Sequence, residues 1–567
     1  MAYFFLLFAL LTNNLYAGFS LRTNLDSNRT QNFLKEVERV LPSKMKEVIN
    51  REVLIEFTEL DNYDSLQNPC VKKEEKQVYG KLGSSILINK NLIPYIENKK
   101  SLTFSCGHKD AYRLAVATII HELVHLFERK STDEYSQSKT YLALVQGQET
   151  VLGPDKIKNQ STGRSPDPYE LANTREHFAV NAEYFFLDSE YACRRPNLNR
   201  FFEEVFAKRN SRCNPNPEIR ILDGDQSLQM NLSPDRIKEV QFLIAGKGEA
   251  MMSRFGHVMF RLVTNNEDQD VVLSFVAQVD STIISMIKGL TGKYPSKMFI
   301  YPYKTALQRY SRSELREVTS YPLKLSENEK TIFLQQVISL YWEYSGKFYF
   351  LSNNCATEGL TLLKSSIRKK SFQEQSVTTP NDLKDLLIKE NLVDLSRVKI
   401  LPSPWKKLEK IYESIKGDTG IETLDEYWKL SALKRRELFP SINSSSIYPF
   451  LAIENAKIFL VNRELEIALG VRLKPLDKDD PIKLLSDQIV RLSNELTYGQ
   501  SLHRGYGIPM QQDFDYVGER EIQNKQQTLA GLNNQLASWI KEGHFEALEE
   551  YNGIIENEAM LKGLLMQ

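Results

Sequence analysis

The stretch 117–130, ATIIHELVHLFERK, places two histidines four residues apart in an apolar run. Residues four apart lie on the same face of an α-helix, so a helix here turns the rings of His121 and His125 toward one point. Glu122 directly follows the first histidine and lies beside that point. Two imidazoles on one helix face are a common zinc-binding pair, and a neighbouring carboxylate can activate a water molecule. We therefore predict a long helix over 109–130 with a metal site on one face.

A further protein ligand is needed, and its best source is a second stretch about 50 residues later, YELANTREHFAVNAEYFFLD (169–188). We expect a helix here. Glu176 and Glu183 are seven residues apart, so they share one face of that helix and either can supply the ligand. His108 and His177 have no ligand spacing to the histidine pair. We assign both to the surface or to packing.

Together the two stretches resemble the lethal-factor-like branch of the gluzincin peptidases. In that branch HExxH is followed by a glutamate that opens an E-x-F-A run, with a tyrosine seven residues before it. The resemblance implies that Glu176 is the third zinc ligand, with Glu183 as the alternative, and that Tyr169 stabilises the oxyanion while Glu122 is the base. The family has a further glutamate after F-A, where this chain has Val180. The alternatives are an ordinary helix pair with solvated polar residues, or a site that binds zinc without catalysis.

A second group of reactive residues lies about 230 residues later, in FYFLSNNCATEGLTLL (348–363). Cys355 follows an extended run and begins an apparent helix, whose N-terminal amides favour a thiolate, so we expect a lowered thiol pKa. His257, in MMSRFGHVMFRL (251–262), is the nearby histidine of the same predicted domain and the candidate base. The simpler alternative is a buried, unreactive cysteine.

Four segments follow one another in the order of a known family: FGHVMFR (255–261), VVLSFVA (271–277), NCAT (354–357) and TPNDLKDLL (379–387). This order resembles the Lnb N-terminal periplasmic domain, a family of exported bacterial domains associated with lipoprotein N-acylation, over about residues 235–390. The resemblance implies a papain-like, permuted NlpC-type α+β fold. It also implies acyl transfer, or amide or thioester cleavage, through Cys355 with His257 as base. Such proteins often continue into membrane spans, and this chain has no later run of about 18 apolar residues.

The first 17 residues, MAYFFLLFALLTNNLYA, are uncharged and mostly apolar, which is typical of a secretory signal peptide cleaved near Ala17. The alternative is a buried N-terminal segment. Four of the five cysteines precede residue 220, and nearest-neighbour pairing gives the disulfides Cys70–Cys106 and Cys193–Cys213, one of three connectivities. Cys355 stays unpaired. We therefore expect a periplasmic or secreted location.

Composition limits the partners and the number of cores. Lys plus Arg (73) equals Asp plus Glu (73), so no overall field favours nucleic acid. A chain of 567 residues with 41% apolar residues is too long for one core. We expect a multidomain α+β protein with these parts: a signal peptide (1–17), a zincin-like metallopeptidase domain (18–220), a linker (212–225), an Lnb-like thiol domain (225–390) and a mainly helical C-terminal region (391–567).

These observations predict an exported bacterial envelope protein with two enzyme-like domains. One is a zinc metallopeptidase domain, with Zn²⁺ as cofactor, and the other is an Lnb-like Cys/His acyl-transfer or amidohydrolase domain. We expect protein, lipoprotein or other cell-envelope substrates, no nucleic acid and no transmembrane span, with peripheral membrane contact left open. The alternative is a non-catalytic envelope interaction protein that retains both folds.

Overall fold

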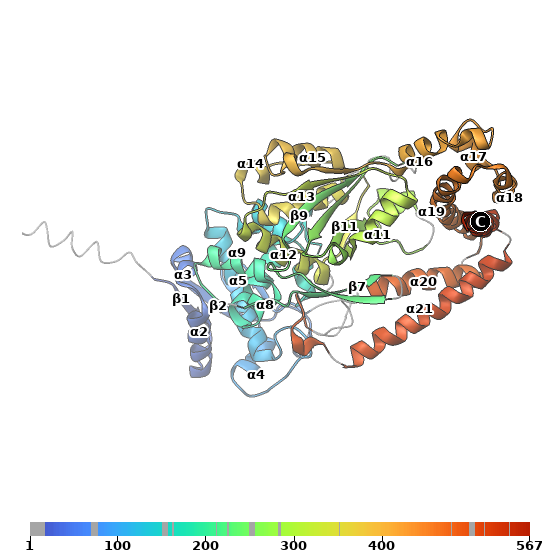
Figure 1. The fold of residues 1–567 in the computed structure, drawn as a ribbon. Coiled ribbons are helices and arrows are strands. Elements are labelled where there is room, and N and C mark those ends of the chain that lie inside the picture. Colours follow the sequence, from blue (N-terminus) through green and yellow to red (C-terminus); the bar gives the residue numbers. More distant parts are fainter. Residues whose placement is uncertain are drawn as a thin grey trace, which may run out of the picture.

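The structure is a computed structural model that shows two large sheets and a helical C-terminal region, as expected for a multidomain α+β chain (Figure 1). The predicted signal peptide and Cys70 lie outside the residues that it describes. Those residues are 18–69, 77–149, 157–160, 164–210, 213–223, 226–248, 256–281, 285–350, 352–477, 479–497, 505–514, 516–543 and 545–566.

The N-terminal part is built on a four-stranded sheet. Its strands lie in the order β1 (Ser20–Thr23), β2 (Glu52–Thr58), β4 (Ile86–Asn89) and β3 (Gly80–Leu82). The first three strands are parallel, and β3 runs antiparallel to β4 at the edge. The sheet packs against the helices α2 (Asn28–Val40), α3 (Ser43–Ile49) and α5 (Ala111–Lys130). The edge strand β3 therefore lies beside α5.

Helix α5 confirms the predicted long helix. Asp110 caps its start, because its side chain accepts a hydrogen bond from the amide of Arg113 at 2.7 Å. Arg129 and Lys130 end it, where positive charge is favourable at the carboxyl end of a helix. Almost every residue between Leu114 and Phe127 is buried, because the sheet covers one side of α5 and α7 (Thr174–Leu187) covers another.

The cysteines of the N-terminal part are oxidised as predicted where the structure describes them. Cys193 and Cys213 form a disulfide, with their Cα atoms 5.1 Å apart. Cys106 is also disulfide-bonded, but its predicted partner, Cys70, lies outside the described residues. Cys355 is unpaired and buried. The predicted pair Cys193–Cys213 is thus confirmed.

The second part is a seven-stranded antiparallel sheet. Its strands lie in the order β14 (Gly346–Phe348), β12 (Tyr294–Pro302), β11 (Val271–Ala277), β10 (His257–Val263), β9 (Glu239–Ala245), β13 (Val318–Pro322) and β15 (Lys399–Leu401). One face packs against α12 (Glu327–Glu343), α13 (Cys355–Ser366) and α15 (Pro380–Lys389). A smaller apolar cluster is formed by other residues of these strands. It includes Ala306 of α11 (Tyr303–Leu307) and Tyr310, which follows that helix. The strands expected from the apolar runs are present, and the edge strand β15 comes from beyond residue 390.

The prediction of a linker at 212–225 was wrong for its second half. Residues Glu218–Asp223 form strand β7, which pairs with β8 (Gln226–Asn231) in an antiparallel hairpin. Ile219 is buried and belongs to the core of the second part. The asparagines and prolines before Glu218 suggested a linker, but the strand pattern EIRILD begins directly after them.

The C-terminal region is mainly helical, as predicted. Helix α19 (Ile447–Leu473) packs against α22 (Glu546–Leu565), and α20 (Pro481–Thr497) lies along α21 (Tyr516–Glu542), as Figure 1 shows. Between α20 and α21 the short segment 505–514 returns to the N-terminal part. There Arg194 donates to the carbonyl of Tyr506 at 3.0 Å and to Asp513 at 2.8 Å. None of the described helices is long and apolar enough to cross a membrane.

The first two parts of the chain share a buried polar interface. Arg195 donates to Glu343 on α12 at 2.9 Å, and the Asn197 amide donates to Gln336 on the same helix at 3.1 Å. A third contact joins Gln146 to α13. Because buried polar groups are costly unless they are paired, these contacts fix how the two parts fit together.

Candidate active sites

Three of the predicted ligands meet at the wall of a cavity. His121 and His125 come from α5, and Glu176 comes from the first turn of α7. The Oε2 atom of Glu176 lies 3.0 Å from Nε2 of His121 and 3.2 Å from Nε2 of His125, and the two nitrogens are 3.1 Å apart. Zinc bonds of about 2.1 Å in a tetrahedron place neighbouring ligand atoms about 3.4 Å apart. The donor set and its spacing therefore fit Zn²⁺.

Local structure explains how Glu176 reaches the histidines. Asn173 caps α7, because its side chain accepts hydrogen bonds from the amides of Arg175 and Glu176 at 2.9 and 3.0 Å. Burial raises the pKa of Glu176, but its contacts with the two histidines outweigh burial and hold that pKa well below the usual range. Glu176 is therefore an ionised carboxylate facing two imidazole nitrogens.

Glu183 lies on the same helix face but behind His121, not beside Glu176. Its Oε1 atom is 2.6 Å from Nδ1 of His121, and its Oε2 atom is 2.7 Å from Nε2 of His108. The Nδ1–H group of His121 thus points at Glu183, and Nε2 is the ring atom that faces the cluster and can bind a metal once it has lost its proton. Burial lowers the pKa of His121, but its bonds to Glu176 and Glu183 raise it to about 10 in the absence of metal.

His108 was missed by the sequence reasoning. We expected a surface or packing residue, but the ring is buried and bonded to Glu183 behind the ligand cluster. No spacing in the sequence indicates this contact, which joins residues 75 positions apart. His177 does act in packing, because its buried ring is hydrogen-bonded to the Tyr141 hydroxyl at 2.7 Å.

The side chain of Glu122 lies between the ligand cluster and the edge strand β3. The carboxyl group lies against Gly80 of β3, where an added Cβ would come within 3.0 Å of Oε1 of Glu122 and 2.6 Å of Thr118. Burial raises the pKa of Glu122, while the two histidines nearby lower it, and the net shift is upward. A carboxyl group with a raised pKa is suited to proton transfer near neutral pH.

The cavity in front of the ligands has a volume of about 1100 Å³. Its walls come from α5, from the start of α7, from Tyr169 and from the edge strand β3. Tyr169 is 46% exposed, and its ring centroid lies 5.9 Å from that of His121. Burial and the charges of Glu176 and Glu122 raise the pKa of Tyr169 to about 12, so its hydroxyl keeps its proton at neutral pH.

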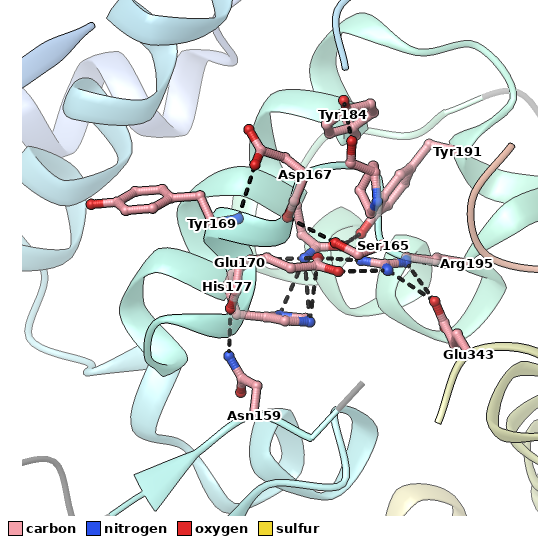
Figure 2. A network of polar contacts seen from close by, with 12 residues as sticks. Asn159, Ser165, Asp167, Tyr169, Glu170, His177, Tyr184, Tyr191, Arg195 and Glu343 are labelled. Carbon is pink, nitrogen blue, oxygen red and sulfur yellow. Dashed lines mark hydrogen bonds and ion pairs between the residues drawn. The ribbon is translucent and has the colours of Figure 1, made fainter. Parts of the chain in front are cut away.

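The turn that carries Tyr169 is anchored from behind, as Figure 2 shows. It is the short helix η3 (Pro168–Leu171), in which Asp167 accepts from the Tyr169 amide at 2.9 Å. The next residue, Glu170, is fully buried and bonded to Arg195 at 2.7 and 3.0 Å. Arg195 also binds Glu343 of the second part at 2.9 Å. The position of Tyr169 therefore depends on a network that crosses the domain interface.

Cys355 lies at the first position of α13, as predicted. Asn354 caps this helix, with its side chain accepting from the amide of Ala356 at 2.9 Å. The cysteine is 8% exposed, and burial raises the pKa of its thiol to about 11, although backbone hydrogen bonds from Val258 and from the helix start act in the opposite direction. The expectation of a lowered thiol pKa was therefore wrong, because desolvation outweighs the helix amides.

His257 begins β10, and the Cys355 sulfur contacts the backbone of the next residue, Val258. Nε2 of His257 lies 2.6 Å from the Ser274 hydroxyl, and its ring stacks on Tyr310 with centroids 5.5 Å apart. Burial, followed by the charges of Arg316 and Arg309, lowers the pKa of His257 to about 3. Both members of the predicted pair are therefore uncharged at neutral pH.

Most of the second sheet and the Cys355 helix lie in a region that matches one known domain family. Residues 225–389 match the Lnb N-terminal periplasmic domain. The resemblance seen in the sequence is thus confirmed for this Lnb-type domain, and it supports a location in the bacterial cell envelope. Residues 20–156 and 146–214 match a domain of unknown function (DUF7844). No curated protein and no solved structure shows a significant match to the chain.

The comparisons leave the gluzincin resemblance of the N-terminal domain a prediction. The described geometry brings its expected residues together: His121, Glu122, His125, Tyr169 and Glu176 all line one cavity. Glu183 lines a second, smaller cavity of about 250 Å³ that adjoins the first at His121 and Glu122.

Proposed function

We propose that this envelope protein of the Lnb type carries a zinc-dependent peptidase in its N-terminal domain. The observation that supports the proposal is the convergence of His121, His125 and Glu176 within 3.2 Å of one another, with Glu183 holding His121 from behind. Three ligands with an open cavity in front of them are the plan of a catalytic zinc site.

Each residue around the cluster has a role in this proposal. A zinc ion bound there would polarise a peptide carbonyl and lower the pKa of water. Glu122 takes the proton of the attacking water and passes it to the leaving amine. The Tyr169 hydroxyl, still protonated at neutral pH, donates a hydrogen bond to the developing oxyanion. The free edge of β3 pairs with an extended peptide backbone.

A second candidate activity belongs to the Lnb-type domain. Its support is the family match together with Cys355 at a helix start beside Val258. We propose an acyl-transfer site in which the Cys355 sulfur attacks an acyl carbon while its proton passes to a base. In this proposal His257 takes that proton, against its lowered pKa, and passes it to the leaving amine or alcohol as the acyl thioester forms. The substrate would be a lipoprotein or another envelope component.

Metal content and cleavage test the first proposal together. Protein expressed with zinc should hold about one Zn²⁺ per chain. His125→Ala and Glu176→Ala should lose the metal, whereas Glu122→Gln should keep it and lose hydrolysis of an unfolded protein such as casein. Cys355→Ala is the matched control and should leave both properties unchanged. Metal-free wild-type protein would overturn the proposal, and zinc without hydrolysis would favour the non-catalytic alternative.

A further inference from the structure

The first turn of the Cys355 helix contains a buried carboxylate. Glu358 is 2% exposed and lies three residues after Cys355. Burial raises the pKa of Glu358, and its hydrogen bonds lower it, with a net upward shift. The side chains that donate to it in the described part of the chain are all neutral: Tyr344, Gln146 and Asn353. A buried carboxylate without a cation depends on every one of its donors.

Glu358 fixes the turn that presents Cys355. The Asn353 amide donates to Oε1 of Glu358 at 2.7 Å and to the carbonyl of Lys347 at 2.9 Å. The backbone of Asn353 also pairs with that of Tyr349, in both directions, at 2.9 and 3.2 Å. These bonds set the path of the chain from β14 into Asn354, the residue that caps the helix. The direction of Cys355 therefore follows from the position of Asn353.

Another donor to Glu358, Gln146, comes from the other domain. Gln146, 212 residues earlier, donates from Nε2 to Oε2 of Glu358 at 2.7 Å and to its carbonyl at 3.0 Å. Gln146 is buried, and its backbone adopts a left-handed conformation with φ of 49°, which is uncommon for a residue with a side chain. The N-terminal domain thus contacts the helix of Cys355 within its first turn.

We propose that Gln146 and Glu358 are positioning residues for Cys355, so that the N-terminal domain forms part of the thiol site. This inference rests on the acyl-transfer activity proposed for the Lnb-type domain. Gln146 completes the donor set of Glu358, Glu358 holds Asn353, and Asn353 sets the turn into the helix. Without Gln146, the buried carboxylate lacks a donor and the turn loses its fixed geometry.

A pair of variants separates this role from general interface stability. Gln146→Met keeps the length of the side chain and removes its donor. Asn197→Leu is the matched control, because Asn197 is equally buried, crosses the same interface to Gln336 at 3.1 Å and does not touch the Cys355 turn. Both variants should lower the unfolding midpoint by a similar amount, whereas Gln146→Met alone should change the thiol site.

Two readouts on the native protein test the proposal. The first readout is the rate of iodoacetamide labelling of Cys355 at about pH 9, where a buried thiol begins to ionise. Relative to wild type, this rate should change about tenfold in Gln146→Met and by less than about twofold in Asn197→Leu. Amide hydrogen exchange of the peptide covering 349–358 should quicken only in Gln146→Met. The exchanged pair Gln146→Glu with Glu358→Gln restores one donor and one acceptor, and it should recover both readouts.

The outcomes distinguish the two proposals. If Cys355 in the wild type resists every electrophile, the acyl-transfer proposal fails, and hydrogen exchange at 349–358 still decides whether Gln146 positions the turn. If Gln146→Met and Asn197→Leu behave alike in both readouts, or if the exchanged pair recovers neither, the positioning role is overturned.

Discussion

Glu183 accepts a hydrogen bond from Nδ1 of His121 at 2.6 Å, on the side of the ring that faces away from the ligand cluster. When a cation displaces the Nε2 proton, this contact keeps the remaining proton on Nδ1 and leaves Nε2 as the ligand atom. It also stops the ring from turning, because Glu183 is itself buried and bonded to His108. The cluster is therefore prepared for a cation before any cation arrives.

Removal of this contact should weaken zinc binding. Glu183→Gln removes the negative charge behind His121, and we expect the zinc affinity to fall about 10- to 100-fold. His108→Gln removes only the hydrogen bond between His108 and Glu183, which is farther from the metal ligands, so zinc affinity should fall less. Competition with a chromophoric zinc chelator measures both variants. Equal affinity of Glu183→Gln and wild type would show that the carboxylate does not support the ligand.

Tyr169 should act on catalysis and not on metal binding. Tyr169→Phe removes the hydroxyl near the cavity while Glu176 and the histidines stay in place. We expect kcat for peptide hydrolysis to fall about 100-fold, the usual loss for one oxyanion donor, with zinc content unchanged. Tyr448→Phe, at a tyrosine that is 69% exposed on α19, is the control. A similar kcat in Tyr169→Phe and the control would remove Tyr169 from the mechanism.

The buried Glu343 should make the stability of the protein depend on pH. Burial raises the pKa of Glu343 from 4.5 to about 7, although Arg195 opposes the shift. Between these values the folded state keeps a proton that the unfolded chain releases, so the contribution of Glu343 to stability falls as the pH rises through this window. The full loss is at most about 3.4 kcal/mol.

Urea unfolding at several pH values measures this effect against Glu343→Gln, which cannot titrate. The difference in unfolding free energy between wild type and the variant should change steadily between the two pKa values and level off above the upper one. A constant difference across the window would mean that Glu343 stays ionised in the folded state.

The disulfide Cys193–Cys213 should stabilise the N-terminal domain. It closes a loop with a sequence separation of 20 residues, for which loop entropy gives about 3 kcal/mol. The double variant Cys193→Ser/Cys213→Ser should lose about this amount in urea unfolding. An unchanged unfolding midpoint would show that the pair contributes little in solution.

The thiol of Cys355 should be protonated at neutral pH. Because burial raises its pKa to about 11, native alkylation should be slower than that of a model thiol at neutral pH and should keep rising into the alkaline range. Because His257 is already neutral near pH 7, His257→Ala removes no charge from beside the thiol and should leave the neutral-pH labelling rate nearly unchanged. A labelling rate that levels off below about pH 8.5 would contradict this expectation.

The helices that carry the candidate site residues can be predicted from the sequence alone. The spacing of His121 and His125 fixes a shared face because helical geometry is local. The strand pattern and the N-C-x-T turn around Cys355 were sufficient for the Lnb-type family. The pairing of Cys193 with Cys213 followed from their short separation. In each case neighbouring residues carry the information.

Tertiary structure alone decided the environment of those residues. His108 reaches Glu183 only because the start of α5 folds against α7, and Gln146 reaches Glu358 only because two domains pack together. The raised pKa of Cys355 could not be predicted from the sequence. A local pattern indicates the amides of a helix start, but it does not indicate burial. Burial and long-range contacts depend on residues far apart in the chain, and these set which groups carry charge and where they point.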